Sequence, residues 1–234
     1  MRSALLFLAA LALIACVRTA REPPASQPTP VAARPAEAWA EDIARFEAAD
    51  RLRPPRPGGV LFVGSSSIRL WPALEADFPS VDVLQRGFGG SKLSDVVHLA
   101  PRIVLPYQPR LIVLYAGDND LEAGKSPAAV FRDYQAFVAL VNRALPETRI
   151  AFIAIKPSGA RWALVEQMRA ANALVRRYAA TDPRLLYVDV FTPMLGPDGM
   201  PREELFVADR LHMNARGYAL WRDLLVPIVR DLAR

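Results

Sequence analysis

The chain has 234 residues, of which 52% are hydrophobic and 23% are charged, and its formal net charge is +5. The arginines behind this charge are scattered among Asp and Glu, with no basic run interleaved with aromatic residues, so we expect no nucleic-acid binding. Cys16 is the only cysteine, which excludes an internal disulfide.

The first 16 residues have the pattern of an export signal. An apolar run from Ala4 to Ala15 is too short for a permanent membrane-spanning helix, and polar, Pro-rich sequence follows it. Leu13-Ile14-Ala15-Cys16 resembles the lipobox of bacterial lipoproteins, in which the cysteine is lipidated. We therefore expect a signal peptide over residues 1–15 and a lipid anchor on Cys16. The alternative is an ordinary signal peptide that is cleaved after Ala15 and leaves a spare thiol.

The segment that follows is rich in Pro, Ala, Arg and Thr and has no apolar periodicity. It cannot bury enough apolar surface to offset the entropy of ordering, so we expect a disordered tether over residues 16–35. Residues 36–234 are enough for one α/β domain with a sizeable core. Val17 is not the aspartate associated with inner-membrane retention in the resembling lipoproteins. That resemblance therefore implies a place in the cell envelope, on the periplasmic face of the outer membrane.

From residue 37 onward, helical and strand patterns alternate. Apolar residues spaced along one face indicate a first helix over residues 37–52. Short apolar runs that end near Gly, Pro or polar residues are candidate strands, at 60–63, 81–84, 111–115, 150–155 and 185–190. Helical patterns lie at 91–103, 127–144, 160–180 and 215–232, the last with Asn214 as a cap. This alternation predicts an α/β fold with about five parallel strands joined by right-handed crossovers.

The first candidate strand ends in a serine triplet. The run from Val60 to Val63 lies between Gly59 and Gly64, and Ser66 follows in the turn after its carboxyl end. Open α/β sheets place their chemistry at that end of the strands. The alternative interpretation is a helix cap, because serine hydroxyls accept hydrogen bonds from free amides at a helix start.

A serine nucleophile needs a base, a group that orients the base, and donors for the oxyanion. The chain has two histidines, and His98 lies inside a helical pattern, where we expect it on the surface. His212 has Asp209 three residues before it, close enough for the carboxylate to fix the imidazole tautomer and stabilise an imidazolium. The alternative is that both residues simply cap the last helix.

Four segments, read together, resemble the sequence blocks of the SGNH (GDSL-type) hydrolase family. They are Gly64-Ser65-Ser66, Gln85-Arg86-Gly87-Phe88-Gly89-Gly90-Ser91, Gly117-Asp118-Asn119-Asp120 and Asp209-Arg210-Leu211-His212. The resemblance implies a flavodoxin-like, three-layer α/β/α sandwich. It also implies a Ser66, His212 and Asp209 triad, with the amides of Ser66 and Gly90 and the side chain of Asn119 as the oxyanion hole. Ser65 stands where the family has aspartate, which puts the usual hydrogen bonding around the nucleophile in doubt.

The activity that this resemblance implies is that of a serine esterase or acylhydrolase, which cleaves a carboxylic ester through an acyl-enzyme. An acyltransferase on an envelope sugar or lipid would use the same residues, and a catalytically silent binding domain is a third possibility. We expect no cofactor and, because no His or Cys cluster is left over, no metal site. Lys156 and Trp162 follow the fourth strand and could line the pocket, or could simply be solvated or part of a helix face.

Overall fold

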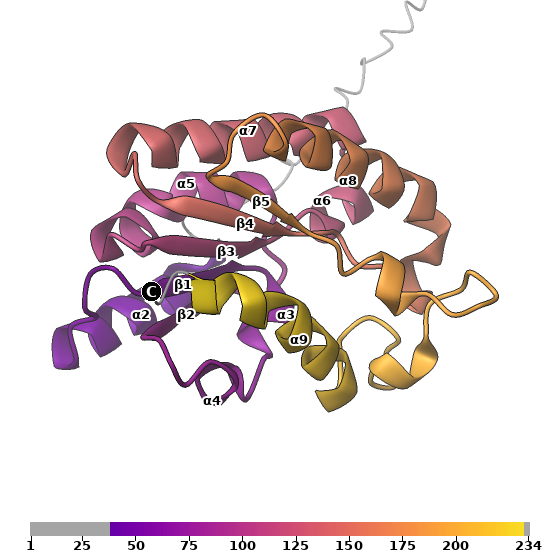
Figure 1. The fold of residues 1–234 in the computed structure, drawn as a ribbon, viewed down its shortest axis with the longest axis horizontal. Coiled ribbons are helices and arrows are strands. Elements are labelled where there is room, and N and C mark those ends of the chain that lie inside the picture. The colour runs from indigo at the N-terminus through magenta and orange to yellow at the C-terminus, as the bar shows by residue number, and fades with distance from the viewer. Residues whose placement is uncertain (1–37, 232–234) are drawn as a thin grey trace, which may run out of the picture. The chain divides into compact units, whose positions relative to one another are not determined.

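A computed structural model of the protein describes residues 38–231, which form a five-stranded parallel sheet with helices on both faces (Figure 1). The strand order is β2-β1-β3-β4-β5, and every neighbouring pair is parallel. The strands are β1 (Val60–Gly64), β2 (Val83–Gly87), β3 (Leu111–Tyr115), β4 (Arg149–Ile153) and β5 (Leu185–Val188). The α/β/α sandwich with five parallel strands that the sequence predicts is therefore confirmed. The expected signal peptide, the tether over residues 16–35 and Cys16 lie outside the described residues.

Eight α-helices in the described part of the chain surround this sheet. They are α2 (Ala40–Leu52), α3 (Ser66–Arg69), α4 (Leu74–Asp77), α5 (Leu93–Ile103), α6 (Asp118–Glu122), α7 (Pro127–Ala144), α8 (Val165–Ala179) and α9 (Ala215–Asp231). The helices α5, α7 and α8 cover one face of the sheet, and α3, α4 and α9 lie on the other (Figure 1). Within residues 38–231 no helix is both long and apolar enough to cross a membrane.

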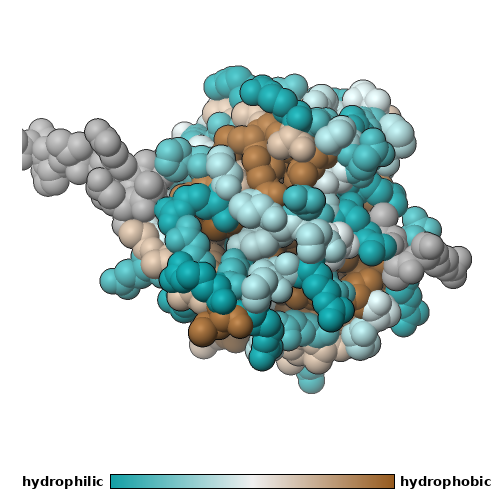
Figure 2. All heavy atoms as spheres, turned by 90° about the vertical axis from the view of Figure 1, so that its left-hand side faces the viewer, coloured by the Kyte–Doolittle hydropathy of each residue, from teal (hydrophilic) through white to brown (hydrophobic). Residues whose placement is uncertain are grey.

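The central strands are apolar at every position because helices cover both of their faces. All five residues of β1 and all five of β3 are buried, so neither strand shows the polar alternation of a half-exposed sheet. The outer surface is different: the face in Figure 2 carries mainly hydrophilic side chains, with hydrophobic ones in separate patches. Hydrophobic burial in the central layer is therefore what holds the sandwich together.

The strand order reverses at β1: the chain passes from β1 to β2 on one side and then crosses back to β3 on the other side of β1. At the carboxyl end of β1, Gly64 is in register with Gly87 on β2 and Tyr115 on β3. Gly64 has φ +138°, and a Cβ at this position would lie 1.8 Å from the carbonyl oxygen of Tyr115. Only glycine permits this close approach, after which the amide of Ser65 donates to the same carbonyl at 3.0 Å.

Element ends differ from the sequence prediction by a few residues. Strand β2 covers 83–87 and not 81–84, because its pairing with β1 continues through Gln85 and Arg86. The polar side chains of these two residues are satisfied by partners on other elements, as in the bond from Gln85 to the carbonyl of Ile68 on α3. The helix expected over 160–180 is an α-helix only from Val165, and a 3₁₀ segment (Gly159–Leu164) precedes it. The four-residue and five-residue helices α4 and α6 were not predicted, because so short a helix shows no apolar periodicity. Helix α3 begins at Ser66, within the serine triplet, and covers only four residues.

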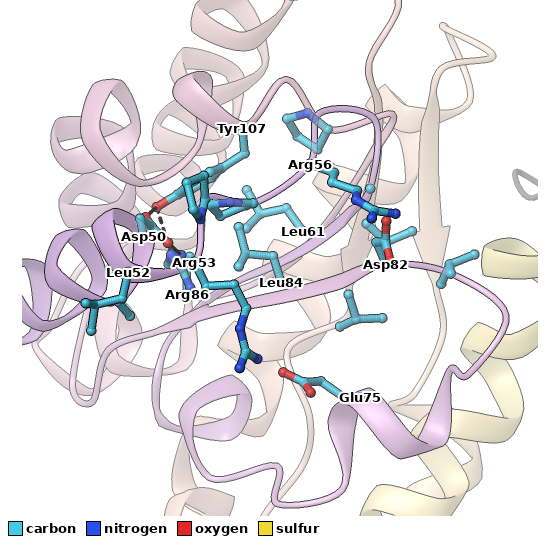
Figure 3. A pocket seen from close by; sticks show the side chains of 18 residues that line it. Asp50, Leu52, Arg53, Arg56, Leu61, Glu75, Asp82, Leu84, Arg86 and Tyr107 are labelled. Carbon is cyan, nitrogen blue, oxygen red and sulfur yellow. Dashed lines mark hydrogen bonds and ion pairs between the residues drawn. The ribbon is translucent and has the colours of Figure 1, made fainter.

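A buried arginine holds α2 against the edge of the sheet (Figure 3). Arg86 of β2 pairs with Asp50 of α2 and donates to the hydroxyl of Tyr107 at 2.8 Å, and that hydroxyl donates to Asp50 at 2.7 Å. Burial, together with the hydrogen bond to Asp50, raises the pKa of Tyr107 to about 12, so the phenol remains a neutral donor. The three side chains form one wall of a cavity of about 870 Å³, which also contacts the first residues of β1 and β2.

Candidate functional site

Three side chains from distant parts of the chain meet at the carboxyl end of the sheet. Ser66 is the first residue of α3, directly after β1, whereas Asp209 and His212 lie in the loop before α9. The Oγ of Ser66 is 3.0 Å from Nε2 of His212, and Nδ1 of the same ring is 2.6 Å from Oδ2 of Asp209. The structure therefore brings the predicted nucleophile, base and orienting acid into one hydrogen-bonded row.

The loop that carries Asp209 and His212 is closed by its own hydrogen bonds. The amide of Val207 donates to the carbonyl of His212 at 2.9 Å, and Arg210 adopts a left-handed φ of +57° at the turn between them. Asn214 donates from Nδ2 to the carbonyls of Glu204 and Phe206, both at 2.9 Å. Its Oδ1 accepts the amide of Arg216 at 2.9 Å, which caps α9 as the sequence predicts.

The carboxylate of Asp209 is held ionised by the same turn. Its Oδ1 accepts the backbone amides of Leu211 and His212 at 2.8 and 2.9 Å. Burial acts to raise the pKa of Asp209, but hydrogen bonds from the backbone and ring of His212 and from Leu211 outweigh it and lower that pKa to about 2. A negative charge therefore faces Nδ1 of His212 throughout the neutral range.

Ser66 differs from its two serine neighbours in its surroundings. Its side chain is partly exposed in the cavity that His212 also lines. Ser65 and Ser67 are buried, and within residues 38–231 their hydroxyl oxygens have no hydrogen-bond partner. Ser65, which occupies the N-cap position of α3, makes no side-chain cap bond. Of the three hydroxyls, only that of Ser66 reaches the imidazole.

Gly90 and Asn119 line the same cavity as Ser66. Gly90 has φ +76°, and a Cβ there would meet no atom within 4 Å, so this glycine is needed for its backbone conformation. The Nδ2 of Asn119 donates to the carbonyl of Ser91 at 3.0 Å, and its Oδ1 accepts from Nη2 of Arg161 at 3.0 Å. An amide nitrogen carries two hydrogens, so one N–H of Asn119 is left for another acceptor.

A buried ionic group lies behind Asn119. The carboxylate of Asp118 is 3.0 Å from Nη1 of Arg161 and 3.3 Å from Nζ of Lys156, and Arg161 also reaches Glu122 at 3.5 Å. Burial acts to raise the pKa of Asp118, but the positive charges of Lys156 and Arg161 lower it. Lys156 is buried with its Nζ 3.2 Å from the hydroxyl of Tyr115, so it does not line the cavity as the sequence suggested, and neither does Trp162.

The cavity has a volume of about 510 Å³ and includes residues that the sequence analysis missed. Asp42 comes from α2 and Trp39 precedes that helix, and the indole of Trp39 donates to the carbonyl of Gly89 at 2.8 Å. Arg69 and Arg161 line the cavity from α3 and from the 3₁₀ segment before α8. Arg161 lies in the connection between β4 and α8, and no sequence motif distinguishes it from the other arginines. The larger cavity of Figure 3 has no serine, cysteine or histidine among its lining residues, and His98 is exposed on α5.

Comparisons with known proteins agree with this architecture. The GDSL-like Lipase/Acylhydrolase family matches residues 61–220. The platelet-activating factor acetylhydrolase IB subunit alpha1 proteins of Homo sapiens and Bos taurus are each 29% identical to this chain over 207 residues, which is 84% of this chain and 85% of theirs. The solved structure of a GDSL-like lipase from Bacteroides thetaiotaomicron shares the fold, with a TM-score of 0.69 at 17% identity over 81% of this chain and 97% of that one. The chain belongs to the GDSL-like lipase/acylhydrolase family.

Proposed function

We propose that the protein is an exported serine esterase or acylhydrolase that cleaves carboxylic esters through an acyl-enzyme. The observation that carries the proposal is the row of Ser66, His212 and Asp209, with contacts of 3.0 and 2.6 Å on the two ring nitrogens. Asp209 accepts a hydrogen bond from the N–H at Nδ1 of His212, so Nε2 has no proton and can accept that of Ser66.

The reaction proceeds in two balanced steps. As Oγ of Ser66 bonds to the ester carbonyl carbon, its proton passes to Nε2 of His212. The carbon–oxygen bond to the alcohol then breaks, and the alcohol leaves with that proton. A water molecule attacks the acyl-enzyme next, giving a proton to His212. The proton returns to Ser66 as the acid departs.

The negative charge on the tetrahedral oxygen is met by the backbone amides of Ser66 and Gly90 and by the free N–H of Asn119. One donor of this kind typically contributes about 3 kcal/mol to transition-state stabilisation. Two observations support this assignment. Ser66, Gly90 and Asn119 line the same cavity, and hydrogen bonds on both ends of the Asn119 side-chain amide fix its orientation.

The test is a screen of the purified protein against short-chain aryl esters, acetylated sugars and lysophospholipids. Acetyl esters come first, because the curated relatives are named acetylhydrolases. We expect hydrolysis, at a rate that Ser66→Ala lowers on the order of 10³-fold or more. A parent protein that hydrolyses none of these esters would contradict the proposal. Adding an alcohol acceptor and analysing the products distinguishes a hydrolase from an acyltransferase.

We further propose that Cys16 is lipidated and holds the enzyme at the periplasmic face of the outer membrane. The support is the lipobox-like sequence Leu13-Ile14-Ala15-Cys16 and the Pro-rich segment after it, all outside the described residues. Stable attachment normally needs two or more acyl chains, which lipoprotein processing supplies.

A further inference from the structure

The cavity that contains Ser66 has an arginine from the same short helix at its rim. Arg69 ends α3 three residues after Ser66, and residues three apart on a helix are neighbours on its surface. Both side chains line the cavity, together with Gly89 and Gly90. A bound ester whose carbonyl reaches Ser66 therefore lies in the same cavity as the Arg69 side chain.

The guanidinium lies against the loop that carries Gly90. A Cβ built on Gly89 would be 2.9 Å from Nε of Arg69, 3.0 Å from Nη2 and 3.1 Å from Cζ. The absence of a side chain at Gly89 is what allows the guanidinium to rest there. Its position beside the Gly89-Gly90 backbone places a cation next to the proposed oxyanion hole.

The other charges around this cavity are paired. Arg161 contacts Asp118 and Glu122, Asp42 contacts Arg45, and His212 contacts Asp209. Among residues 38–231, the side chain of Arg69 has no carboxylate partner and no hydrogen bond. The cavity therefore has one uncompensated positive charge, on a group whose planar N–H donors match the oxygens of a carboxylate or phosphate.

We propose that Arg69 binds an anionic oxygen group, a carboxylate or a phosphate, on the ester substrate, so that the enzyme selects anionic esters over neutral ones. This inference rests on the proposed esterase function and adds the class of substrate. Arg69 is then a specificity-determining residue, since its contact with the remote anionic group does not involve the reacting carbonyl.

The test compares 4-acetoxybenzoate with its neutral methyl ester, which present the same acetyl group to Ser66. In Arg69→Gln we expect kcat/KM for the anionic ester to fall about tenfold, as for loss of one charge-assisted hydrogen bond, with the neutral ester changing less than about twofold. Arg69→Lys, which keeps the charge without the planar donors, should retain part of the preference. The control is Arg132→Gln, which removes the same charge from an exposed position on α7 and should leave both rates unchanged.

Binding is measured separately in a Ser66→Ala background by calorimetry, with 4-acetoxybenzoate, its methyl ester and 4-acetoxyphenyl phosphate as probes. We expect Arg69→Gln to weaken binding of one or both anions about tenfold, and the anion affected identifies the group recognised. Equal losses for the neutral and anionic esters, or unchanged anion binding, would overturn the inference. If the parent hydrolyses no ester, the proposed function fails, and the calorimetric arm still decides whether Arg69 binds an anion.

Discussion

Arg161 donates a hydrogen bond from Nη2 to Oδ1 of Asn119, and the two atoms are 3.0 Å apart. This contact determines which end of the amide faces the cavity, because a flipped amide would set two donor groups against each other. Asp118 holds Arg161 in turn, at 3.0 Å. The buried ionic group behind the cavity thereby orients the proposed oxyanion donor.

Arg161→Met should lower kcat about tenfold and change KM less, because the amide it positions acts mainly in the transition state. Asn119→Ala should lower kcat about 10²-fold to 10³-fold. In the double variant, removing Arg161 should add little to the loss from Asn119→Ala, since the two residues act as one unit. Steady-state kinetics of the four proteins measure this coupling. Fully additive losses would mean that Arg161 acts on the substrate and not through Asn119.

The low pKa of Asp209 predicts a pH-dependent contribution to stability. Its folded-state pKa of about 2 lies below the ordinary value of 3.8, so the contribution is complete above about pH 4 and is lost as the pH falls toward 2. Asp209→Asn should therefore lower Tm at pH 6 by about 2 °C, a small effect because the side chain is half exposed, and the difference should shrink at pH 2.5. Thermal melts at both pH values measure it. A constant difference in Tm would show that the carboxylate charge is not the cause.

The strands and the local motifs could be predicted from sequence because each depends on a short stretch of chain. Uninterrupted apolar runs bounded by glycine identify β1, and the spacing of Asp209 and His212 is that of a single turn. The contact between Ser66 and His212 spans 146 residues, so only the family resemblance connected them. The exact ends of β2 depended on pairing with a neighbouring strand, which periodicity does not encode.

Arg69 and Arg161 could not be assigned from sequence for a physical reason. Arginine is common in this chain, and these two differ from the others only in the residues that lie beside them in the folded structure. Arg161 lies inside the 3₁₀ segment (Gly159–Leu164), at the kink, where a regular helix start was expected. Arg69 ends a four-residue helix, which is too short for apolar periodicity to show which of its residues face a cavity. Lys156, conversely, was a candidate for the pocket and is buried against Asp118 and Tyr115.

The lipid-anchor proposal predicts that Cys16→Ser releases the protein from membranes. The thiol is the acceptor of the lipid in the resembling lipoproteins, and serine at that position does not accept it. Fractionation of cells that express the full chain measures the change, with total esterase activity as a control for folding. A variant that sediments with membranes as the parent does would contradict the assignment.

Gly64 and Gly90 both have positive φ, but they should respond differently to alanine. At Gly64 a Cβ would lie 1.8 Å from a backbone oxygen, whereas at Gly90 it would meet nothing within 4 Å. Gly64→Ala should therefore lower the free energy of unfolding by on the order of 4 kcal/mol or more. Gly90→Ala should lower the free energy of unfolding by only about 1–2 kcal/mol, because alanine is strained at a positive φ. Urea unfolding measures both, and similar losses would contradict the close packing of β1 against β3.

The serine triplet gives the sharpest test of the proposed nucleophile. Ser66→Ala should lower the rate on the order of 10³-fold or more, because only binding and the oxyanion hole then remain. Ser65→Ala and Ser67→Ala should keep turnover. Both should also leave stability unchanged or raise it, since each removes a buried hydroxyl that has no partner within residues 38–231. If the Ser65 hydroxyl instead capped α3, Ser65→Ala would lower the free energy of unfolding by about 1 kcal/mol. Turnover and Tm of the three variants, with mass spectrometry of a phosphonate adduct, separate these outcomes. An adduct on Ser65 or Ser67, or full turnover in Ser66→Ala, would refute the nucleophile assignment.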